Sequence, residues 1–175
     1  LAYLLRYDTV YGKYDKEVRD LKEKGKKYLV VEGKKILSLS EKDPKNLPWR
    51  KLGIDVVVES TGVFNSADKA AFHLKAGAKR VVISAPAKGD VEHVLCGANE
   101  DRLSSPSLGE ITSNASCTTN AVVPVAAVLM KNPGVKKAML NTIHGYTVSQ
   151  ALVDSPSPKD FRKGRAAAQN IIPSH

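Results

Sequence analysis

Apolar residues early in the chain gather in short runs of the kind that form strands. Lys27–Glu32 (KYLVVE) and Lys35–Leu39 (KILSL) are rich in β-forming residues and are separated by Gly33, which predicts a hairpin. Asp55–Ser60 (DVVVES) is a continuous apolar run bounded by polar residues. Such a run is typical of a strand that is covered on both faces in a parallel sheet.

A helical pattern separates this run from a second one. In Ala67–Ala76 (ADKAAFHLKA) the apolar residues have helical spacing, and the pattern ends at Gly77, a residue suited to a C-terminal cap. Lys79–Ser84 (KRVVIS) then predicts another buried strand. The order strand, helix, strand is that of a right-handed βαβ unit. We therefore predict the α/β fold class.

The second half of the chain predicts a helix between further strands. His93–Gly97 (HVLCG) and Glu110–Ser113 (EITS) are candidates for short strands. Ser116–Lys131 is rich in alanine, valine and leucine and is long enough for a helix. An interior proline costs a helix roughly 3 kcal/mol, so Pro124 predicts either a kink or a helix that begins nearer to it. Lys136–Gln150 predicts a long strand.

Composition places the chain among globular proteins. Of its 175 residues, 42% are hydrophobic and 26% are charged, which is close to the globular average. No apolar stretch reaches the roughly 18 residues of a membrane span, and no segment resembles a signal peptide. The chain begins with what resembles the inside of an amphipathic helix (Ala2–Tyr7) and stops at His175 without an end signal. We therefore expect a piece of a longer protein that has no membrane partner.

The net charge of +9 is spread along the chain rather than clustered. In Lys13–Lys27, for example, lysines are mixed with aspartates and glutamates, a pattern that favours a solvated surface over a nucleic-acid footprint. The charge would also attract an anionic substrate or cofactor. Cys96 and Cys117 form neither a disulfide framework nor a CxxC or CxxH spacing, so we expect no metal site and a reducing, cytoplasmic setting.

The segment Ser113–Asn120 (SNASCTTN) surrounds one cysteine with small hydroxyl and amide residues. If Ser116 or Asn114 caps the following helix, Cys117 lies in its first turn. The helix dipole and the unpaired N–H groups there favour the thiolate, which is the nucleophilic form, and could also hold an oxyanion of the substrate. The alternative is a buried cysteine that packs as a small hydrophobic residue, which is the interpretation we prefer for Cys96.

A thiol nucleophile usually works with a base, and His144 is the best candidate. It lies 27 residues after Cys117, at the end of an apolar run. His73, His93 and His175 are expected to be ordinary surface or packing residues. A cysteine–histidine pair alone does not distinguish a cysteine protease from a thiol-dependent dehydrogenase or acyltransferase.

Small residues follow both strands of the predicted βαβ unit. Glu59–Gly62 (ESTG) closes the first strand and Ser84–Pro86 (SAP) closes the second. Ligands of open α/β sheets bind beyond the carboxyl ends of the strands, so these segments favour a nucleotide site; the alternative is a simple turn after each strand. The basic residues Arg162, Lys163 and Arg165 are expected to face solvent rather than to bind an anion.

Seven segments together carry a family resemblance: AYLLRYDTVYGKY (Ala2–Tyr14), KDPKNLPW (Lys42–Trp49), DVVVESTGVF (Asp55–Phe64), AGAKRVVISAPAKGD (Ala76–Asp90), SNASCTTN (Ser113–Asn120), TIHGYT (Thr142–Thr147) and RAAAQNIIP (Arg165–Pro173). In sequence and order they closely resemble the phosphorylating glyceraldehyde-3-phosphate dehydrogenase family, and SNASCTTN is similar to the whole active-site signature of that family. Several long motifs in one order are far more specific than a cysteine–histidine pair.

The resemblance implies an α/β architecture in two parts. Residues 1–115 would form an incomplete Rossmann-type nucleotide-binding domain, and residues 116–175 the start of an α+β catalytic domain that includes the active-site cysteine. Residues 146–173 are similar to a loop that packs at a subunit interface in homotetramers. The family's glycine-rich fingerprint and further phosphate ligands would lie outside the chain, so we expect this piece alone to be inactive.

The resemblance also implies a reaction. The Cys117 thiolate would attack the aldehyde of glyceraldehyde 3-phosphate, and His144 would take the hydroxyl proton as hydride leaves for the nicotinamide of NAD, with NADP left open as the cofactor. Inorganic phosphate would then attack the thioester to give 1,3-bisphosphoglycerate. A covalent intermediate of this kind splits one difficult step into two easier ones.

Further residues receive a role from the resemblance, position by position. Those similar to phosphate ligands are Ser116, Thr118 and Thr147. Those similar to cofactor-binding residues are Glu41 and Lys42 beside the adenine, Thr61, Gly62 and Phe64 around the adenosine, and Ser84 and Ala85 beside the nicotinamide half. The chain departs from the family at Ala121, where many members have a second cysteine, and at Ser155–Pro156, which leaves the preference for NAD only partly supported.

Two alternatives stay open. A dehydrogenase of erythrose 4-phosphate in the same family shares the thiol and the histidine, but it hydrolyses the thioester instead of passing it to phosphate. A non-catalytic nucleic-acid-binding role, suggested only by the net charge, would require salt-dependent binding with many released counterions. We do not expect nucleic acid to be the main partner.

Overall fold

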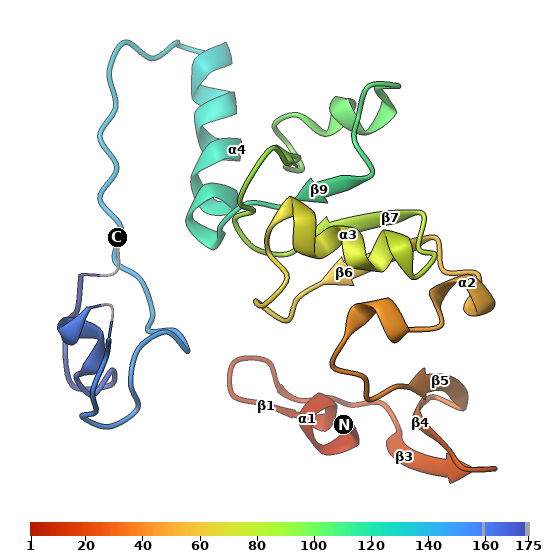
Figure 1. Ribbon diagram of the computed structural model, residues 1–175. Coiled ribbons are helices and arrows are strands. Elements are labelled where there is room, and N and C mark those ends of the chain that lie inside the picture. The colour runs from red at the N-terminus through yellow and green to blue at the C-terminus, as the bar shows by residue number, and fades with distance from the viewer. Residues whose placement is uncertain (159, 174–175) are drawn as a thin grey trace. The chain divides into compact units, whose positions relative to one another are not determined.

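The computed structural model describes residues 1–158 and 160–173 (Figure 1). Two compact units divide the chain, the first from Leu1 to Pro124 and the second beginning at Val125. The strands named below all lie in the first unit. No helix in the described part of the chain is both long enough and apolar enough to cross a membrane.

The first unit begins with small antiparallel elements. Helix α1 (Ala2–Arg6) leads into a strand pair formed by β1 (Tyr7–Asp8) and β2 (Gly12–Lys13). A three-stranded antiparallel sheet follows, in the order β3 (Val18–Glu23), β4 (Lys26–Val31) and β5 (Lys34–Ser38). The pairing of β4 with β5 confirms the predicted hairpin.

Strand β3 lies within Lys13–Lys27, the segment predicted to be a solvated surface. Most of its side chains are exposed, as predicted, but Val18 is only 1% exposed and pairs with Val31 of β4. One buried residue in a run of charges is too weak a signal for a strand. The backbone hydrogen bonds to β4 decide the conformation, because strand formation depends more on neighbours than on intrinsic preference.

A four-stranded parallel sheet follows in the same unit. Its order is β6 (Val56–Glu59), β7 (Arg80–Ile83), β9 (Ile111–Ser113) and β8 (Glu92–His93). Helix α3 (Ala67–Lys75) joins β6 to β7, which confirms the predicted βαβ unit (Figure 1). Because neighbouring strands run in one direction, their carboxyl ends lie at one edge of the sheet.

Apolar packing between α3 and this sheet forms a small core. Ala70, Val81 and Ile83 are at most 1% exposed and pack together. The prediction that both faces of β6 are covered is wrong for the described residues: Val57 is buried, but Val58 is 64% exposed. A continuous apolar run indicates a strand, yet it does not reveal how many of the strand's faces are covered.

The helix that follows β9 is continuous. Helix α4 (Cys117–Lys131) contains Pro124, so the predicted alternative of a helix that begins nearer to this proline is wrong. Because a proline removes only one intrahelical hydrogen bond, a helix of 15 residues can include it. Shorter helical elements lie in the connections between strands: η1 (Pro44–Asn46), α2 (Trp49–Leu52) and η2 (Glu100–Ser104).

The second unit is mostly irregular between α4 and η3 (Phe161–Gly164). Lys136–Gln150, predicted as a long strand, contains no strand, so that prediction is wrong. Its apolar side chains are exposed, for example Met139 (95%) and Ile143 (98%). A strand needs a neighbour to complete its backbone hydrogen bonds, and the part of the chain described by the structure supplies none at this segment.

Candidate active site

The carboxyl ends of three parallel strands meet at one edge of the sheet. Glu59 of β6 pairs with Ile83 of β7, which in turn pairs with Ser113 of β9. Three segments with predicted site residues follow these strand ends: Thr61–Phe64, Ser84–Ala85 and Ser116–Thr118. The parallel topology therefore directs segments that are far apart in the sequence to the same edge.

Hydrogen bonds continue across this edge beyond the strands. The Ser84 N–H donates to the Glu59 carbonyl (2.9 Å), and the Ser84 hydroxyl donates to the same oxygen (3.2 Å). On the other side, the Asn114 N–H donates to the Ile83 carbonyl (2.9 Å). The turn predicted to lie beside the nicotinamide is thus held between its two neighbouring strand ends.

The buried Ser113 side chain connects this turn to the loop that precedes the cysteine. Its hydroxyl donates to the Ala85 carbonyl (2.7 Å) and accepts from the Ala115 N–H (3.0 Å). Ala115 has a φ of +56°, in the left-handed region that residues other than glycine rarely adopt. No separate role was predicted for Ser113, because a serine at a strand end carries no signal of its hydrogen-bond partner.

Helix α4 begins at a capped N-terminus. The Ser116 hydroxyl accepts from the Thr119 N–H (3.0 Å), the usual N-cap hydrogen bond. Asn114, the alternative cap, instead offers its carbonyl to the Asn120 side chain (2.6 Å). Cys117 is the first residue of the helix and is exposed. Its thiol is therefore accessible at a positive helix end, a setting that favours the thiolate.

Among the predicted phosphate ligands, Thr118 has a side-chain hydroxyl whose hydrogen-bonding capacity is unsatisfied in the described part of the chain. Thr118 Oγ1 is buried and has no hydrogen-bond partner within residues 1–158 and 160–173. A buried polar group without a partner costs about 1–3 kcal/mol, and a bound oxyanion would supply the partner. Nearby, the Ser116 and Thr119 hydroxyls hydrogen-bond each other (2.7 Å). The first turn of α4 thus combines an accessible thiol with a hydroxyl suited to an anion.

The segment predicted to surround the adenosine leaves β6 as a tight turn. Thr61 and Gly62 are exposed, and Gly62 has a φ of +74° with open space where a Cβ would stand. Phe64 is half-buried and packs edge-to-face against the His73 ring, with the ring centroids 6.3 Å apart. The turn is therefore exposed at Thr61 and Gly62, as a strand-end site requires.

A buried carboxylate precedes this turn. The Glu59 side chain is 3% exposed, and its Oε2 lies 3.0 Å from Nε2 of His73, whose side chain is 6% exposed. The Trp49 indole N–H donates to His73 Nδ1 (3.0 Å), and the Thr61 N–H donates to Glu59 Oε1 (2.7 Å). His73 is therefore a packing residue. Glu59 lies two positions after Val57, on the covered face of β6, and this alternation is the signal by which its burial could have been predicted.

Glu59 keeps its charge in spite of its burial. Burial acts to raise the pKa of this carboxyl group, but hydrogen bonds from Thr61 and His73 together lower it by more, so the pKa of Glu59 lies below its ordinary value. An ionised carboxylate accepts hydrogen bonds through both oxygens. Glu59 therefore serves two partners at neutral pH, one in a helix and one in the turn.

The predicted adenine-binding pair lies outside the parallel sheet. Glu41 and Lys42 are exposed residues between β5 and η1. The Glu41 carboxylate accepts from the Asp43 N–H (3.0 Å), and the Asp43 carboxylate accepts from the Lys45 N–H (3.0 Å) at the start of η1. These bonds order the segment locally, and its contact with a cofactor stays a prediction.

His144 and Thr147 belong to the second unit, whereas Cys117 belongs to the first. His144 Nδ1 donates to the Gly145 carbonyl (2.6 Å), because a carbonyl oxygen can only accept. In the neutral ring, Nε2 then carries the lone pair that a general base needs. The Thr147 hydroxyl is hydrogen-bonded to the Ser149 hydroxyl (2.8 Å). The pairing of Cys117 with His144 stays a prediction.

Cys96 is exposed, so its expected place in the core is wrong. Strand β8 ends at His93 and does not continue to Gly97 as predicted. The chain turns after this point, where the Leu95 N–H donates to the Asn99 side chain (2.8 Å), and Leu95 is the residue that becomes buried (6% exposed). Apolar neighbours in the sequence therefore did not indicate burial of the cysteine, because it lies in the turn after the strand.

The arginines near the end of the second unit are paired with acids. Arg162 Nε lies 2.9 Å from Asp160 Oδ1, and Arg165 Nη1 lies 3.0 Å from Asp154 Oδ2. The hydrogen bonds from Arg162 hold the pKa of Asp160 below its ordinary value. Both arginines face solvent, as expected, and each has a carboxylate partner within its own unit.

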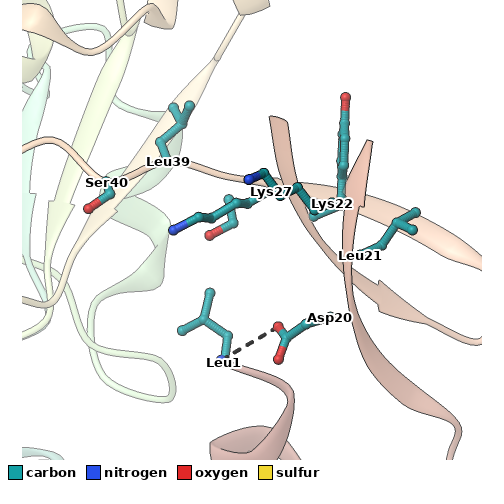
Figure 2. A pocket seen from close by; sticks show the side chains of 9 residues that line it. Leu1, Asp20, Leu21, Lys22, Lys27, Leu39 and Ser40 are labelled. Atoms are coloured by element: carbon teal, nitrogen blue, oxygen red, sulfur yellow. Dashed lines mark ion pairs between the residues drawn. The ribbon is translucent and has the colours of Figure 1, made fainter. Parts of the chain in front are cut away.

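An open pocket lies on the three-stranded sheet and contains none of the predicted site residues (Figure 2). The Leu1 amino group lies there, 3.6 Å from the Asp20 carboxylate. The residues that line the pocket are Leu1, Asp20, Leu21, Lys22, Lys27, Tyr28, Ser38, Leu39 and Ser40. It is distinct from the sheet edge at which Cys117 lies.

Comparison with known proteins identifies the family. Residues 1–67 match the family model for the NAD binding domain of glyceraldehyde 3-phosphate dehydrogenase, and residues 116–175 match the model for its C-terminal domain. The chain belongs to the glyceraldehyde-3-phosphate dehydrogenase family. The predicted resemblance and the Rossmann-type α/β fold class are therefore confirmed.

Curated members of the glyceraldehyde-3-phosphate dehydrogenase family align with almost the whole chain. Glyceraldehyde-3-phosphate dehydrogenase 2 of Bacillus subtilis is 47% identical over 174 residues, and glyceraldehyde-3-phosphate dehydrogenase 1 of Trichormus variabilis is 50% identical over 176. The protein of this family from Thermotoga maritima is 48% identical over 174 residues. These alignments cover 99% of this chain and 49–50% of each relative. The chain thus spans about half the length of the curated relatives it matches.

Proposed function

We propose that the protein containing this chain is a phosphorylating glyceraldehyde-3-phosphate dehydrogenase, which oxidises glyceraldehyde 3-phosphate with NAD and inorganic phosphate to 1,3-bisphosphoglycerate. The observation that carries this proposal is the exposed Cys117 thiol at the capped N-terminus of α4. It follows β9 directly, at the edge where the Thr61 and Ser84 segments also leave the sheet. Membership of the family supports this substrate class.

Chemistry begins with the Cys117 thiolate, which forms a carbon–sulfur bond to the aldehyde carbon. The carbonyl oxygen takes up the Nε2 proton of a protonated His144, the ion-pair partner of the thiolate, and becomes the hydroxyl of a hemithioacetal, which leaves the ring neutral. His144 Nε2 then removes this proton while hydride leaves the same carbon, and the product is a thioester. NAD, when bound, supplies the hydride acceptor. Phosphate attacks the thioester, the carbon–sulfur bond breaks, and Cys117 is released as the thiolate together with the acyl phosphate.

Features of the sheet edge support the proposal that it binds a dinucleotide. In the turn at Thr61–Phe64 the first three residues are exposed, and a Cβ at Gly62 would meet no atom within 4 Å. Ser84 and Ala85 are small enough to let the nicotinamide half approach the next strand end. Glu41 and Lys42 would flank the adenine. The match to an NAD binding domain supports NAD as the cofactor, with NADP as the alternative.

Three residues would bind the phosphate groups of the substrates. They are Ser116, Thr118 and Thr147. Support for this role comes from the buried Thr118 hydroxyl, whose missing hydrogen-bond partner an oxyanion would replace. The N–H groups in the first turn of α4 and the helix dipole add to the attraction for an anion.

The second unit supports a proposal about assembly and location. It exposes large apolar side chains that a solvated surface would not need: Val148, Leu152, Val153, Phe161 and Ile171. We therefore propose that these residues contribute to a subunit interface in a homotetramer. The low cysteine content, two in 175 residues, supports a cytoplasmic location.

The test is NADH formation by the protein containing this chain, with glyceraldehyde 3-phosphate as the substrate. The Cys117→Ser variant is expected to lose phosphate-dependent NADH formation, because a serine hydroxyl is a far weaker nucleophile at neutral pH. Cys96→Ser is the matched control, since Cys96 is an exposed thiol of the same unit, and it should keep the activity. Phosphate-dependent activity that survives in Cys117→Ser would contradict the proposal.

A requirement for phosphate also distinguishes the proposed enzyme from the erythrose-4-phosphate dehydrogenase of the same family. Omission of phosphate should stop turnover of glyceraldehyde 3-phosphate after one equivalent of NADH per active site, because the thioester then has no acceptor. Continued turnover of erythrose 4-phosphate to a free acid without phosphate would instead identify the hydrolysing dehydrogenase.

A further inference from the structure

Side chains from three elements form one hydrogen-bonded chain that ends at the Thr61 turn. Trp49 of α2 donates from its indole N–H to His73 Nδ1 of α3 (3.0 Å). His73 Nε2 lies 3.0 Å from Oε2 of Glu59 at the end of β6. The other oxygen, Glu59 Oε1, accepts from the Thr61 N–H (2.7 Å) and from the Thr61 hydroxyl. Both ionisable members are almost fully buried, with side chains 6% and 3% exposed.

The direction of this chain follows from its first member. An indole N–H can only donate, so His73 Nδ1 must carry a lone pair. The ring proton is then on Nε2 and points to Glu59, which as a carboxylate can only accept. A doubly protonated His73 would place two donors, Nδ1–H and the Trp49 N–H, against each other. The geometry therefore selects one neutral tautomer of His73.

The same imidazole also supports the far end of the turn. Phe64 packs edge-to-face against the His73 ring, with the centroids 6.3 Å apart and the planes at 77°. Within the turn, the Val63 N–H donates to the Thr61 hydroxyl (3.2 Å), which is itself bonded to Glu59. The turn is thus held at both ends. Thr61 is bonded to Glu59, which His73 orients, and Phe64 packs on the His73 ring itself.

We propose that Glu59 is a positioning residue for the cofactor: the Trp49–His73–Glu59 chain holds Thr61–Phe64 in the conformation that receives the adenosine half of the dinucleotide. This inference rests on the proposed function, because it takes the turn to be part of the cofactor site. An apolar residue would fill the same volume without the cost of burying a charge. The carboxylate contributes something that an apolar side chain lacks, which is two acceptors in fixed directions.

The variant Glu59→Gln tests the directions of the hydrogen bonds at position 59, because it keeps the volume of the side chain nearly unchanged. Its amide has one oxygen and one NH2 group in place of two acceptors. If the oxygen accepts from Thr61, the NH2 group faces His73 Nε2–H; if the oxygen accepts from His73, the NH2 group faces the Thr61 N–H. The histidine cannot change tautomer to relieve this conflict while Trp49 donates to Nδ1. Every arrangement leaves two donors opposed.

Equilibrium binding of NAD to the protein containing this chain provides the main readout. Glu59→Gln is expected to raise the dissociation constant for NAD by about tenfold, the effect of one disrupted hydrogen bond to a charged group. Turnover at saturating NAD should change by less than about twofold, because the thiol and the base are unaffected. Glu110→Gln, which alters an exposed carboxylate next to β9 of the same sheet, is the control and should bind NAD normally.

A second substitution should relieve the opposition of two hydrogen-bond donors that Glu59→Gln creates. In the double variant Glu59→Gln with Trp49→Phe, His73 can move its proton to Nδ1 and accept from the new amide through Nε2. NAD should therefore bind to the double variant more tightly than to Glu59→Gln alone. Equal or weaker binding by the double variant would overturn the proposed hydrogen-bond direction, since loss of packing alone would make the two changes additive or worse.

The tautomer can be checked without any variant at Glu59. Nitrogen NMR of the unmodified protein should show His73 with Nε2 protonated and Nδ1 unprotonated, the signals being assigned by their loss in His73→Gln. The opposite tautomer would overturn the inference even if Glu59→Gln fails to fold. Absence of NAD binding by the unmodified protein would overturn the proposed function and this inference with it. Normal NAD binding that Glu59→Gln leaves unchanged would overturn the inference only.

Discussion

The Ser113 hydroxyl donates to the Ala85 carbonyl at 2.7 Å, and this one bond joins two strand ends of the parallel sheet. On one side is the turn proposed to lie beside the nicotinamide, and on the other is the loop that leads to Cys117. The same hydroxyl accepts from Ala115, whose φ is +56°. Under the proposed function, the relative position of the hydride acceptor and the nucleophile would depend on a residue that contacts neither.

Replacing Ser113 by alanine should weaken both the fold and the reaction. The Ala115 N–H is left buried without its acceptor, which costs about 1–3 kcal/mol in the free energy of unfolding. We expect a lower denaturant midpoint and a reduced kcat, with a smaller change in the KM for phosphate. Ser107→Ala is the control, because its hydroxyl belongs to an exposed pair with Ser105. Unchanged stability in Ser113→Ala would contradict the assigned bond.

Two serines at helix N-termini provide a matched test of the cap. The Ser116 hydroxyl accepts from a backbone N–H of α4, whereas Ser66, at the N-terminus of α3, forms no side-chain cap bond. Ser116→Ala should lower stability by about 1 kcal/mol. It should also slow alkylation of Cys117 at neutral pH roughly two- to fivefold, because a frayed first turn stabilises the thiolate less.

The control for this experiment is Ser66→Ala, which should change neither stability nor alkylation by a comparable amount. Alkylation is followed with iodoacetamide in the Cys96→Ser background, so that one thiol of this chain reports. Equal effects of the two serine substitutions would show that the cap bond to Thr119 does not stabilise the nucleophile.

The stability of the protein should depend on pH through Glu59. Its pKa in the fold lies below that of an unfolded glutamate, which is about 4.3. The carboxylate therefore stabilises the fold fully above that pH, and the contribution is lost as the pH falls through the folded-state pKa. The difference in free energy of unfolding between the unmodified protein and Glu59→Gln should be largest near neutral pH and shrink below pH about 4.

Urea denaturation at a series of pH values measures this difference. Glu110→Gln again serves as the control, because the side chain of Glu110 is exposed and its removal should give a nearly constant difference. A difference for Glu59→Gln that increases on acidification would mean that the carboxyl group is destabilised by its burial rather than held as an anion.

Two glycines with positive φ should respond differently to alanine. Gly77 follows α3 with a φ of +107°, and a Cβ there would lie 2.4 Å from the Cβ and 2.8 Å from the Cα of Arg50. Gly53 has a φ of +62° and open space around it. Gly53→Ala should therefore cost only about 1–2 kcal/mol, the penalty of a left-handed alanine.

Gly77→Ala should cost more than Gly53→Ala, because the backbone of Arg50 must also move and the hydrogen bond from Arg50 N–H to the Ala76 carbonyl (3.1 Å) is disturbed. Thermal or urea denaturation of the two variants in parallel measures the contrast. Equal destabilisation by the two substitutions would show that the close approach of Arg50 is relieved without cost.

Sequence patterns predict well those helices and strands whose formation depends on residues within the same segment. The helix over 67–75 follows from apolar spacing and a glycine stop, and β6 and β7 follow from buried-type runs beside turn residues. The seven motifs, with SNASCTTN around Cys117 among them, were sufficient to recognise the family, because their residue types and order are specific. These features do not depend on a distant partner.

Strand pairing and side-chain burial that depend on residues far away in the sequence could not be predicted in this way. The strand expected over 136–150 does not form, because backbone hydrogen bonds between strands need a neighbour as well as a suitable sequence. Cys96 was assigned to the core from its apolar neighbours, but the turn after β8 exposes it. Because β8 ends at His93, Leu95 rather than Cys96 becomes buried.

The sequence alone identified the family and predicted a nucleophilic cysteine with the residues around it, since those lie in contiguous motifs. Only the tertiary structure brought Ser113 to Ala85 and linked Glu59 with His73 and Trp49. Each of these bonds joins residues that are 14 to 28 positions apart in the chain, with buried groups that must find a donor or an acceptor. Strand register and helix packing select those partners, and no local pattern encodes them.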